Sequence, residues 1–304
     1  MIRQLQIENF RCLRSVTMTL EPLTVFVGAN ASGKSSVFAA LAKANRGDYV
    51  TEDFWARKTG SPIRITTRGD EGVETQRGTC PSIGTSPVCQ HLQFDLTHLR
   101  ATSTVIELRS LHASGQGLPN VFATLTRREQ DAIAKSFCEL VPMFADITLR
   151  PHGPGKHWVL FQDRWHPEIW HEPTQVSDGS MLLLAYLLLP YQSPPPDIIA
   201  IEEPERGLHP YLMGQLVSVL RRLANGDLGP RKVQVLLATH SAELLEFVKP
   251  EEVRLFTRPK NTGETRVEMA PVNDPSWPKT LRVYDESLGD LWLSGGLGGV
   301  PGHG

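Results

Sequence analysis

The sequence predicts an α/β fold in which a largely parallel core sheet is covered by helices. From residue 177 onward, apolar strands alternate with helical patterns, as is typical of parallel sheets with helices on both faces. The expected strands cover 197–202, 233–238 and 253–257. The expected helices cover 181–189, 211–224 and 241–247. Near the N-terminus, LTVFVGANASGKSSVFAALAKA (23–44) has the pattern of another strand, a glycine-bearing loop and a helix.

The segments before residue 177 predict a second, antiparallel arrangement. Alternating apolar runs separated by turn residues indicate short strands. These strands are expected at 3–10, 15–22, 62–68, 89–96 and 103–109. Helical periodicity runs from 124 to 142, where Pro142 ends it. ITLRP (147–151) and HWVLFQD (157–163) are expected to form a hairpin around the turn HGPGK.

The composition is that of a globular protein of 304 residues with a net charge of −2. Residues 1–150 carry 17 Lys/Arg against 14 Asp/Glu, which excludes a globally basic nucleic-acid binder but permits a basic face in the first half. The four cysteines lack metal-ligand spacing and fit a reducing cytosol. The longest apolar stretch, 181–190, is about half the length of a membrane span. We therefore expect a soluble, cytoplasmic protein that does not enter the membrane.

A phosphate-binding loop is predicted between the strand and the helix of 23–44. Gly28-Ala29-Asn30-Ala31-Ser32-Gly33-Lys34-Ser35 matches G-x-x-x-x-G-K-[ST]. The glycines let successive N–H groups turn toward a phosphate, Lys34 can reach the β- and γ-phosphates, and the Ser35 hydroxyl can bind Mg²⁺. The helix that follows directs its positive end at the same anion. The segment is therefore predicted to bind a nucleotide.

Two adjacent carboxylates end the strand IIAIEE, where Glu202 and Glu203 would repel each other without a positive partner. In a P-loop ATPase an acid in this place holds the Mg²⁺ ligand shell, and we assign that role to Glu202. Glu203 is then expected to align and deprotonate the attacking water. His240, at the end of the strand VQVLLAT, is placed to contact the γ-phosphate or that water. Glu203, His240 and Lys34 are the predicted catalytic residues.

A further anion site is predicted at Val176-Ser177-Asp178-Gly179-Ser180, which precedes the apolar helix MLLLAYLLL. A serine and a glycine at a helix N-terminus favour anion binding. Taken alone, these residues favour a simple N-cap of a core helix, but the presence of the other three motifs favours the anion site.

Together these motifs resemble the ABC-class ATPase heads of the SMC, RecF and OLD (overcoming lysogenisation defect) families. The likeness begins with IENFRCLRSVTMTLEPLTVFVGANASGKSS and covers roughly residues 1–250. It continues with SDGS as a variant ABC signature, IEEPERGLHP as Walker B and D-loop, and ATHS as the switch-histidine motif. The EEPE-x-x-LHP form and the SDG signature are most similar to stand-alone OLD-like AAA-type ATPases that lack a Toprim domain.

The resemblance implies a P-loop NTPase fold of the ABC-type ATPase head, with a mixed or parallel core sheet, an antiparallel β subdomain and a helical lobe. It implies one domain over 1–304. The expected parts are an N-terminal lobe with the phosphate loop and antiparallel strands (1–117), a helical signature lobe (118–190), the Walker B and switch-histidine core (191–275) and a C-terminal tail (276–304).

The resemblance also implies ATP and Mg²⁺ as cofactors and a homodimer that closes on ATP. Gly28–Ser35, the following Ser36 and Arg11 would bind the nucleotide, with Glu202 and Ser35 on the metal. Ser177 and Gly179 would act in trans on the partner's nucleotide, and His209 would lie in the D-loop at the dimer seam. Asn9, Phe10 and Arg11 would flank the base or ribose. The Q-loop glutamine stays open among Gln76, Gln90 and Gln93.

The resemblance suggests that effector chemistry lies on another polypeptide. Full OLD-type nucleases carry a Toprim domain with a D-x-D pair after the ATPase, but only 64 residues follow His240 and no D-x-D occurs. The acids Asp274, Asp285, Glu286 and Asp290 are scattered and are not expected to form a nuclease site. We expect a molecular switch that controls a separate nuclease or toxin in phage defence or nucleic-acid surveillance. Residues 287–299 would either dock such a partner or form a helix that packs back on the head.

An alternative function is a RecF-like DNA-repair ATPase that clamps duplex DNA. Its basic face would use Arg3, Arg14, Arg64, Arg68, Arg77 and Arg100. A transport ATPase is disfavoured, because the SDG signature is atypical of transporters.

Overall fold

The structure is a computed structural model that describes residues 1–304 except 71, 73, 81, 86, 285–286 and 298–304. The chain forms two compact units. Unit 1 is built from three separate segments of the chain, 1–91, 197–205 and 234–304. Unit 2 is built from 92–196 and 206–233.

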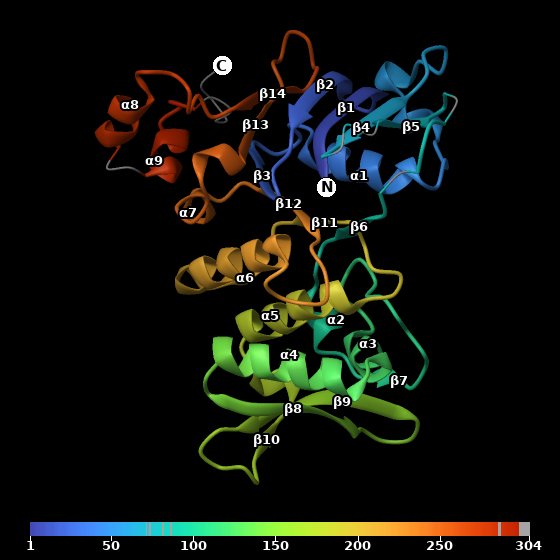
Figure 1. Cartoon of the computed structure of the whole chain (residues 1–304), viewed down its shortest axis with the longest axis vertical. Coiled ribbons are helices and arrows are strands. Elements are labelled where there is room, and N and C mark those ends of the chain that lie inside the picture. The colour runs from blue at the N-terminus through green and yellow to red at the C-terminus, as the bar shows by residue number, and fades with distance from the viewer. Residues whose placement is uncertain (71, 73, 81, 86, 285–286, 298–304) are drawn as a thin grey trace. The chain divides into compact units, whose positions relative to one another are not determined.

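The core of unit 1 is a six-stranded sheet with the order β14-β13-β3-β12-β11-β6 (Figure 1). Its strands are β3 (Leu23–Gly28), β6 (Cys89–Leu92), β11 (Ile198–Glu202), β12 (Gln234–Thr239), β13 (Val253–Thr257) and β14 (Arg266–Met269). β3, β11, β12 and β13 run parallel, while β14 is antiparallel to β13. β3 and β12 are buried along their whole length, as expected for parallel strands covered on both faces. The predicted α/β class with a mixed core sheet is confirmed.

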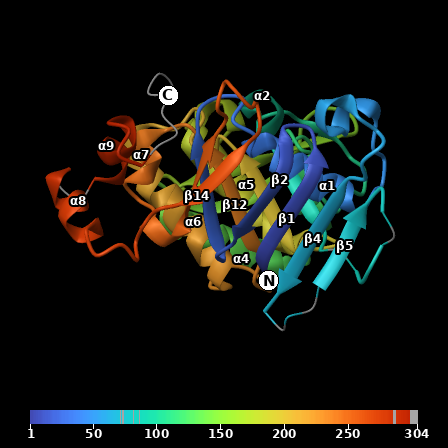
Figure 2. The ribbon, with the colours of Figure 1, turned by 90° about the horizontal axis from the view of Figure 1, so that it is seen from above.

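A second, antiparallel sheet of unit 1 has the order β2-β1-β4-β5 (Figure 2). Its strands are β1 (Ile2–Phe10), β2 (Leu13–Thr19), β4 (Arg64–Gly69) and β5 (Glu74–Gly78). α1 (Lys34–Ala44) contacts both β1 and β3, so this helix joins the two sheets. Its Phe38 stacks on Phe26 of β3, which in turn contacts Phe256 of β13, with ring centroids 5.4 and 4.9 Å apart. Apolar burial between the sheets therefore holds the phosphate-loop helix in place.

The C-terminal helices of unit 1 are α7 (Ala242–Leu245), α8 (Trp277–Val283) and α9 (Leu288–Leu293). α9 packs on α7, with Leu291 and Trp292 buried. Glu246 accepts hydrogen bonds from the Ser287 hydroxyl (2.7 Å) and the Gly289 N–H (2.8 Å). Of the two expectations for 287–299, the described part therefore follows the helix that packs back on the head. Asp285, Glu286 and residues 298–304 lie outside the described residues.

Unit 2 combines helices with a small antiparallel sheet (Figure 1). Its helices are α2 (Leu96–Leu99), α3 (Leu118–Thr124), α4 (Arg127–Leu140), α5 (Asp178–Leu188) and α6 (Met213–Asn225). Its strands are β7 (Ser103–Thr104), β8 (Phe144–Pro151), β9 (Lys156–Asp163) and β10 (Trp170–His171). The expected hairpin is the β8–β9 pair, which packs on α4 through Phe137, Phe144 and Phe161. Among the described residues, no helix is long and apolar enough to cross a membrane.

Two strand predictions were wrong. Residues 103–109 were expected to form a strand, but only Ser103–Thr104 does so, and it pairs with β9. Val105 and Ile106 are both 59% exposed, so this apolar run lacks the buried face that a longer strand needs. Residues 89–96 were expected in the antiparallel sheet, but β6 covers only Cys89–Leu92 and joins the core sheet. Asp95 ends the extended segment, because its side chain accepts from the Thr97 N–H and caps α2.

One buried amide ties the two sheets of unit 1 together. Gln234 lies at the start of β12 and is 1% exposed. Its Oε1 accepts from the Ile2 N–H (2.9 Å), and its Nε2 donates to the carbonyls of Ile2 (2.8 Å) and Glu21 (3.1 Å). These bonds satisfy backbone groups that are shielded from water.

Replacing Gln234 by alanine should destabilise unit 1. The Ile2 N–H and two carbonyls would lose a partner, and we expect the free energy of unfolding to fall by about 1–3 kcal/mol. Urea denaturation followed by circular dichroism measures this. Gln93→Ala is the control, because Gln93 is exposed. Equal midpoints for the two variants would show that the Gln234 bonds contribute nothing.

Candidate nucleotide-binding site

The loop between β3 and α1 has the backbone that the glycine pattern predicts. Gly28 has φ +155° and Gly33 has φ +114°, values that side-chain-bearing residues rarely adopt. A Cβ on Gly28 would lie 2.2 Å from the Phe256 carbonyl oxygen, and one on Gly33 would lie 2.3 Å from Thr265 Oγ1. The glycines therefore do more than cradle an anion, since they also let the β13–β14 hairpin pack against the loop. Thr265 completes this contact by donating to the Ser32 carbonyl (2.8 Å).

Lys34, at the start of α1, is buried and turned back toward the loop. Its Nζ donates to the carbonyls of Gly28 (2.7 Å) and Ala29 (2.9 Å). Burial lowers the pKa of Lys34, and the carboxylates of Glu202, Glu203 and Glu205 offset part of that effect. The lysine is thus the cation that faces the acidic strand end of this unit.

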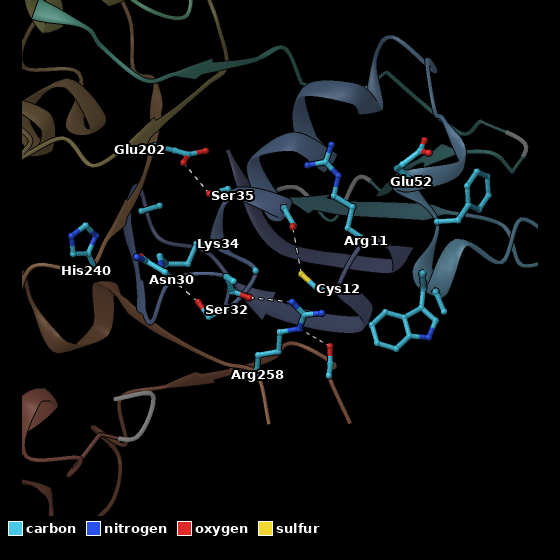
Figure 3. A pocket seen from close by; sticks show the side chains of 18 of the residues that line it. Arg11, Cys12, Asn30, Ser32, Lys34, Ser35, Glu52, Glu202, His240 and Arg258 are labelled. Carbon is cyan, nitrogen blue, oxygen red and sulfur yellow. Dashed lines mark hydrogen bonds between the residues drawn. The ribbon is translucent and has the colours of Figure 1, made fainter. Parts of the chain in front are cut away.

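Parallel pairing brings the ends of β11 and β12 to the same edge of the sheet as the loop. Glu202 pairs with Ala238, which pairs with Phe26, and Thr239 pairs with Val27, so both strands end within two residues of Gly28. Ser35 donates to Glu202 Oε2 over 2.9 Å (Figure 3). Ser35 and Glu202, which the sequence placed on one metal, are therefore brought together.

Glu202 has a second partner that sequence reasoning missed. His91 Nε2 lies 2.7 Å from Glu202 Oε1, and because an ionised carboxylate only accepts, the imidazole donates. This hydrogen bond is the main reason that the pKa of Glu202 lies below its ordinary value, since it outweighs the desolvation that would raise it. The Q-loop glutamine was left open among Gln76, Gln90 and Gln93, whereas the residue of β6 that contacts Glu202 is His91.

Glu203 points elsewhere because its backbone turns. Its φ is +47°, an uncommon value for a non-glycine residue, and its N–H donates to the Ala238 carbonyl (2.8 Å). Its Oε1 lies 3.5 Å from His240 Nδ1. Such strained residues cluster at functional sites. The two predicted catalytic residues Glu203 and His240 are thus neighbours.

A third acid, Glu205, is buried beneath this pair. Thr239 donates to Glu205 Oε1 (2.5 Å), whereas Oε2 has no hydrogen-bond partner among the described residues. Burial raises the pKa of Glu205. The Thr239 hydroxyl also accepts from the Ser241 N–H (2.9 Å), so this network holds the chain on either side of His240.

Lys34, Ser35, Glu202, Glu203 and His240 line one cleft of about 620 Å³ in unit 1. Most of the predicted site residues line it: Arg11, Asn30, Ala31, Ser32, Gly33, Lys34, Ser35, Ser36, Glu202, Glu203 and His240. The carbonyls of Gly28 and Ala29 accept the hydrogen bonds that orient the Lys34 ammonium. Of the three residues expected near the base or ribose, only Arg11 lines the cleft, while Phe10 is fully buried and the Asn9 amide donates to the Pro62 carbonyl (3.0 Å).

Further lining residues carried no motif that sequence reasoning could use. Glu52, Phe54, Trp55, Ala56, Arg57, Arg258 and Gly263 complete the wall. Arg258 donates hydrogen bonds to the Ala31 carbonyl of the phosphate loop (3.4 Å) and to the Gly263 carbonyl (2.7 Å). The β13–β14 connection brings it there, and neither spacing nor composition indicates such a long-range contact.

The signature turn lies in unit 2. Ser177 caps α5 by accepting from the Ser180 N–H (3.2 Å). Arg100 fixes the turn, donating to the Pro173 and Val176 carbonyls (3.0 and 2.7 Å) and pairing with Asp178. A Cβ on Gly179 would lie 2.4 Å from Leu212 Cδ1, so this glycine packs closely against the Leu212 side chain. His209 is exposed and accepts from the Tyr211 N–H (3.3 Å).

A glycine-rich loop after a central parallel strand, followed by a helix and faced by an acidic strand end, is the architecture of a P-loop NTPase. Comparison with known proteins narrows this class. A family model described as an AAA ATPase domain matches residues 1–67. A second model matches residues 124–246 and is described as an AAA domain, with reference to the AbiEii toxin and a type IV TA system.

One relative is an OLD nuclease of Thermus scotoductus, 40% identical over 55 residues. The match covers 18% of this chain and 9% of that nuclease. The SMC head domain from Thermotoga maritima superposes with a TM-score of 0.52 at 14% identity, over 88% of this chain and 98% of that one. An SmcHead bound to the C-winged helix domain of ScpA superposes with a TM-score of 0.58 at 14% identity, over 88% of this chain and 96% of that one. For a Pyrococcus furiosus Smc head bound to a ScpA C-terminal domain, the TM-score is 0.57 at 12% identity, over 94% of this chain and 98% of that one.

At identities of 12–14% the solved structures show the fold, which is that of an SMC head. Each AAA match covers less than half of the chain and the OLD match covers 55 residues, so these comparisons show a similarity to ATPase heads of the SMC/OLD kind.

The packing of Gly28 yields a prediction. Gly28→Ala should lower the thermal midpoint strongly, because the added Cβ meets the backbone carbonyl of Phe256, which cannot move aside cheaply. Gly47→Ala is the matched control: φ is +69° but nothing lies within 4 Å of the added atom. We expect about 1–2 kcal/mol of destabilisation in the control, from backbone strain alone, and at least twice that at Gly28. Similar losses in both variants would contradict the packing role.

Proposed function

We propose that the chain is an ATP-driven molecular switch that dimerises on ATP and controls a separate effector protein. The observation that supports it best is the convergence of Lys34, Ser35, Glu202, Glu203 and His240 in one cleft. Parallel register places these five side chains from three chain segments at one sheet edge. This is the set of groups that phosphoryl transfer to water requires.

The residues present fit Mg²⁺. The Ser35 hydroxyl and the Glu202 carboxylate offer oxygen ligands 2.9 Å apart, and Mg²⁺ prefers oxygen donors, with substrate phosphates and waters filling its shell. Bound there, the metal would neutralise phosphate charge. His91 would hold the Glu202 carboxylate in place through its hydrogen bond.

The chain's own residues would carry out the remaining steps. The N–H groups of the phosphate loop and the Lys34 ammonium would bind the β- and γ-phosphates. Glu203 would orient the attacking water and accept its proton, and His240 would contact the γ-phosphate from the same side. The left-handed backbone at Glu203 separates this carboxylate from Glu202, so the two neighbours can take different roles.

In the proposed dimer, the partner's signature turn would complete the site through Ser177 and Gly179. The Arg100 contacts and the Ser177 cap give this turn a fixed conformation. His209, exposed in the D-loop, would lie at the seam.

Support for effector control comes from the relatives. One matched family is described with reference to a toxin of a TA system, one relative is an OLD nuclease, and two Smc heads are described as bound to ScpA domains. We propose by extension that this head acts on a separately encoded nuclease or toxin in a phage-defence or surveillance system. The DNA-clamp alternative has weaker support. Arg3, Arg14, Arg64, Arg68 and Arg100 all pair with carboxylates, and Arg77 donates to backbone carbonyls.

Glu203→Gln should abolish turnover while retaining ATP binding. Removal of a general base lowers kcat by about 10²- to 10⁴-fold, whereas the phosphate contacts stay intact. With ATP and Mg²⁺ this variant should accumulate as a dimer, which light scattering measures as a doubled mass. Glu243→Gln, at an exposed glutamate outside the cleft, is the control. Normal hydrolysis by Glu203→Gln would place the base elsewhere.

The partner can be identified with the same variant. Glu203→Gln, loaded with ATP and Mg²⁺, should retain a stoichiometric second protein when purified from cells that express its native neighbouring genes. Mass spectrometry of the complex identifies that protein. Recovery of a dimer carrying duplex DNA alone, with binding that weakens steeply as salt rises, would instead support the clamp.

A further inference from the structure

One end of the cleft has no part in the phosphate chemistry. Figure 3 shows Glu202 and His240 on one side of the phosphate loop, and Arg11 and Glu52 on the other. The second side is lined by residues 52 and 54–57 of a short segment that follows α1. We call residues 51–57 the strap. It consists of two 3₁₀ turns, Thr51–Asp53 and Trp55–Arg57.

The direction of a bound nucleotide follows from this arrangement. If the γ-phosphate lies by Glu203 and His240, the chain of phosphates crosses the loop and the nucleoside must extend away from the acidic end. At that end of the cleft, residues of the strap form the wall. Its lining includes Phe54 and Trp55, both partly buried, and base–aromatic stacking is a general mode of nucleotide recognition.

The strap is held rigidly against the phosphate-loop elements. Asp53 is fully buried and accepts from Arg11 Nε (3.0 Å), from the Val50 N–H (3.1 Å) and from Lys43 of α1. Burial would raise the pKa of Asp53, but the bonds from Lys43, Val50 and Arg11 outweigh it and lower the pKa. The carboxylate is therefore ionised at neutral pH and fixes the strap to both the helix and Arg11.

The backbone of the strap is also unusual. Ala56 and Arg57 are consecutive non-glycine residues with φ +50° and +55°. Each such residue costs about 1–2 kcal/mol relative to ordinary backbone, and this strain is tolerated because the anchored segment around it is over-determined. The turn presents Ala56 and Arg57, both exposed, to the cleft directly after Trp55.

We propose that the strap forms the nucleoside subsite, in which the Trp55 indole stacks on the base of the bound nucleotide. This inference rests on the proposed function, because it takes the phosphate orientation from it. The subsite would take the base and ribose of ATP or ADP, with Arg11, one of the residues expected near the base or ribose, beside the strap.

ADP and inorganic pyrophosphate, each with Mg²⁺, separate the two parts of the site without turnover. Trp55→Ala should weaken ADP binding about tenfold or more, while pyrophosphate affinity changes less than about twofold, as measured by calorimetry. Trp55→Phe should restore most of the ADP affinity, because phenylalanine also stacks. It should also remove the ADP-induced change in tryptophan fluorescence. Trp165→Ala, at a tryptophan of unit 2 that is 69% exposed, is the control and should alter neither ligand.

Lys34→Ala distinguishes failure of the subsite from failure of the proposed function. It should weaken ADP and pyrophosphate alike. If it weakens neither, the phosphate-loop assignment itself is wrong. If Lys34→Ala behaves as expected but Trp55→Ala leaves ADP binding intact, or weakens both ligands equally, the nucleoside subsite is overturned.

Discussion

The position of β3 between two parallel neighbours is the constraint on which the rest of unit 1 depends. β12 pairs with one edge of β3 and β13 with the other, and the registers bring Thr239 and Phe256 level with Val27 and Gly28. A shift of one residue would turn buried side chains to the opposite face. β3 is buried along its whole length, and a shift would also separate Phe26 from Phe38 and Phe256, against which it packs. Packing of the sheet therefore aligns the phosphate loop, the end of β12 before His240 and the end of β11 at Glu202, without any ligand.

This alignment explains the paired glutamates at the end of β11. The first, Glu202, remains in the strand, and hydrogen bonds from Ser35 and His91 stabilise its carboxylate. The second, Glu203, leaves the strand through a left-handed turn and faces His240. Two adjacent charges are tolerated because backbone geometry sends them to different partners, with Lys34 nearby as a common cation.

Short sequence patterns were sufficient to predict the features that depend on neighbouring residues in the chain. The glycine loop, the apolar parallel strands and the strand-end acids all follow from short-range rules, and the structure has them at the expected places. His91 was missed because no motif marks it, and its contact with Glu202 joins two segments that are far apart in the sequence. Trp55 and Arg258 reach the cleft through contacts between distant segments, on which sequence spacing carries no information. The prediction of a strand over 103–109 was wrong because β-branched residues favour a strand only where their side chains can be buried against a neighbouring surface, and here they are exposed.

The interrupted path of the chain through unit 1 has a consequence for biosynthesis. β3 is made early, but its neighbours β12 and β13 begin only at Gln234 and Val253. All of unit 2 emerges from the ribosome before either neighbour. During that interval β3 has apolar faces and bare edges, which are aggregation hazards in a nascent chain. Completion of the catalytic sheet is thus a late event in translation, and ribosomes that stall before residue 253 would release chains in need of chaperones.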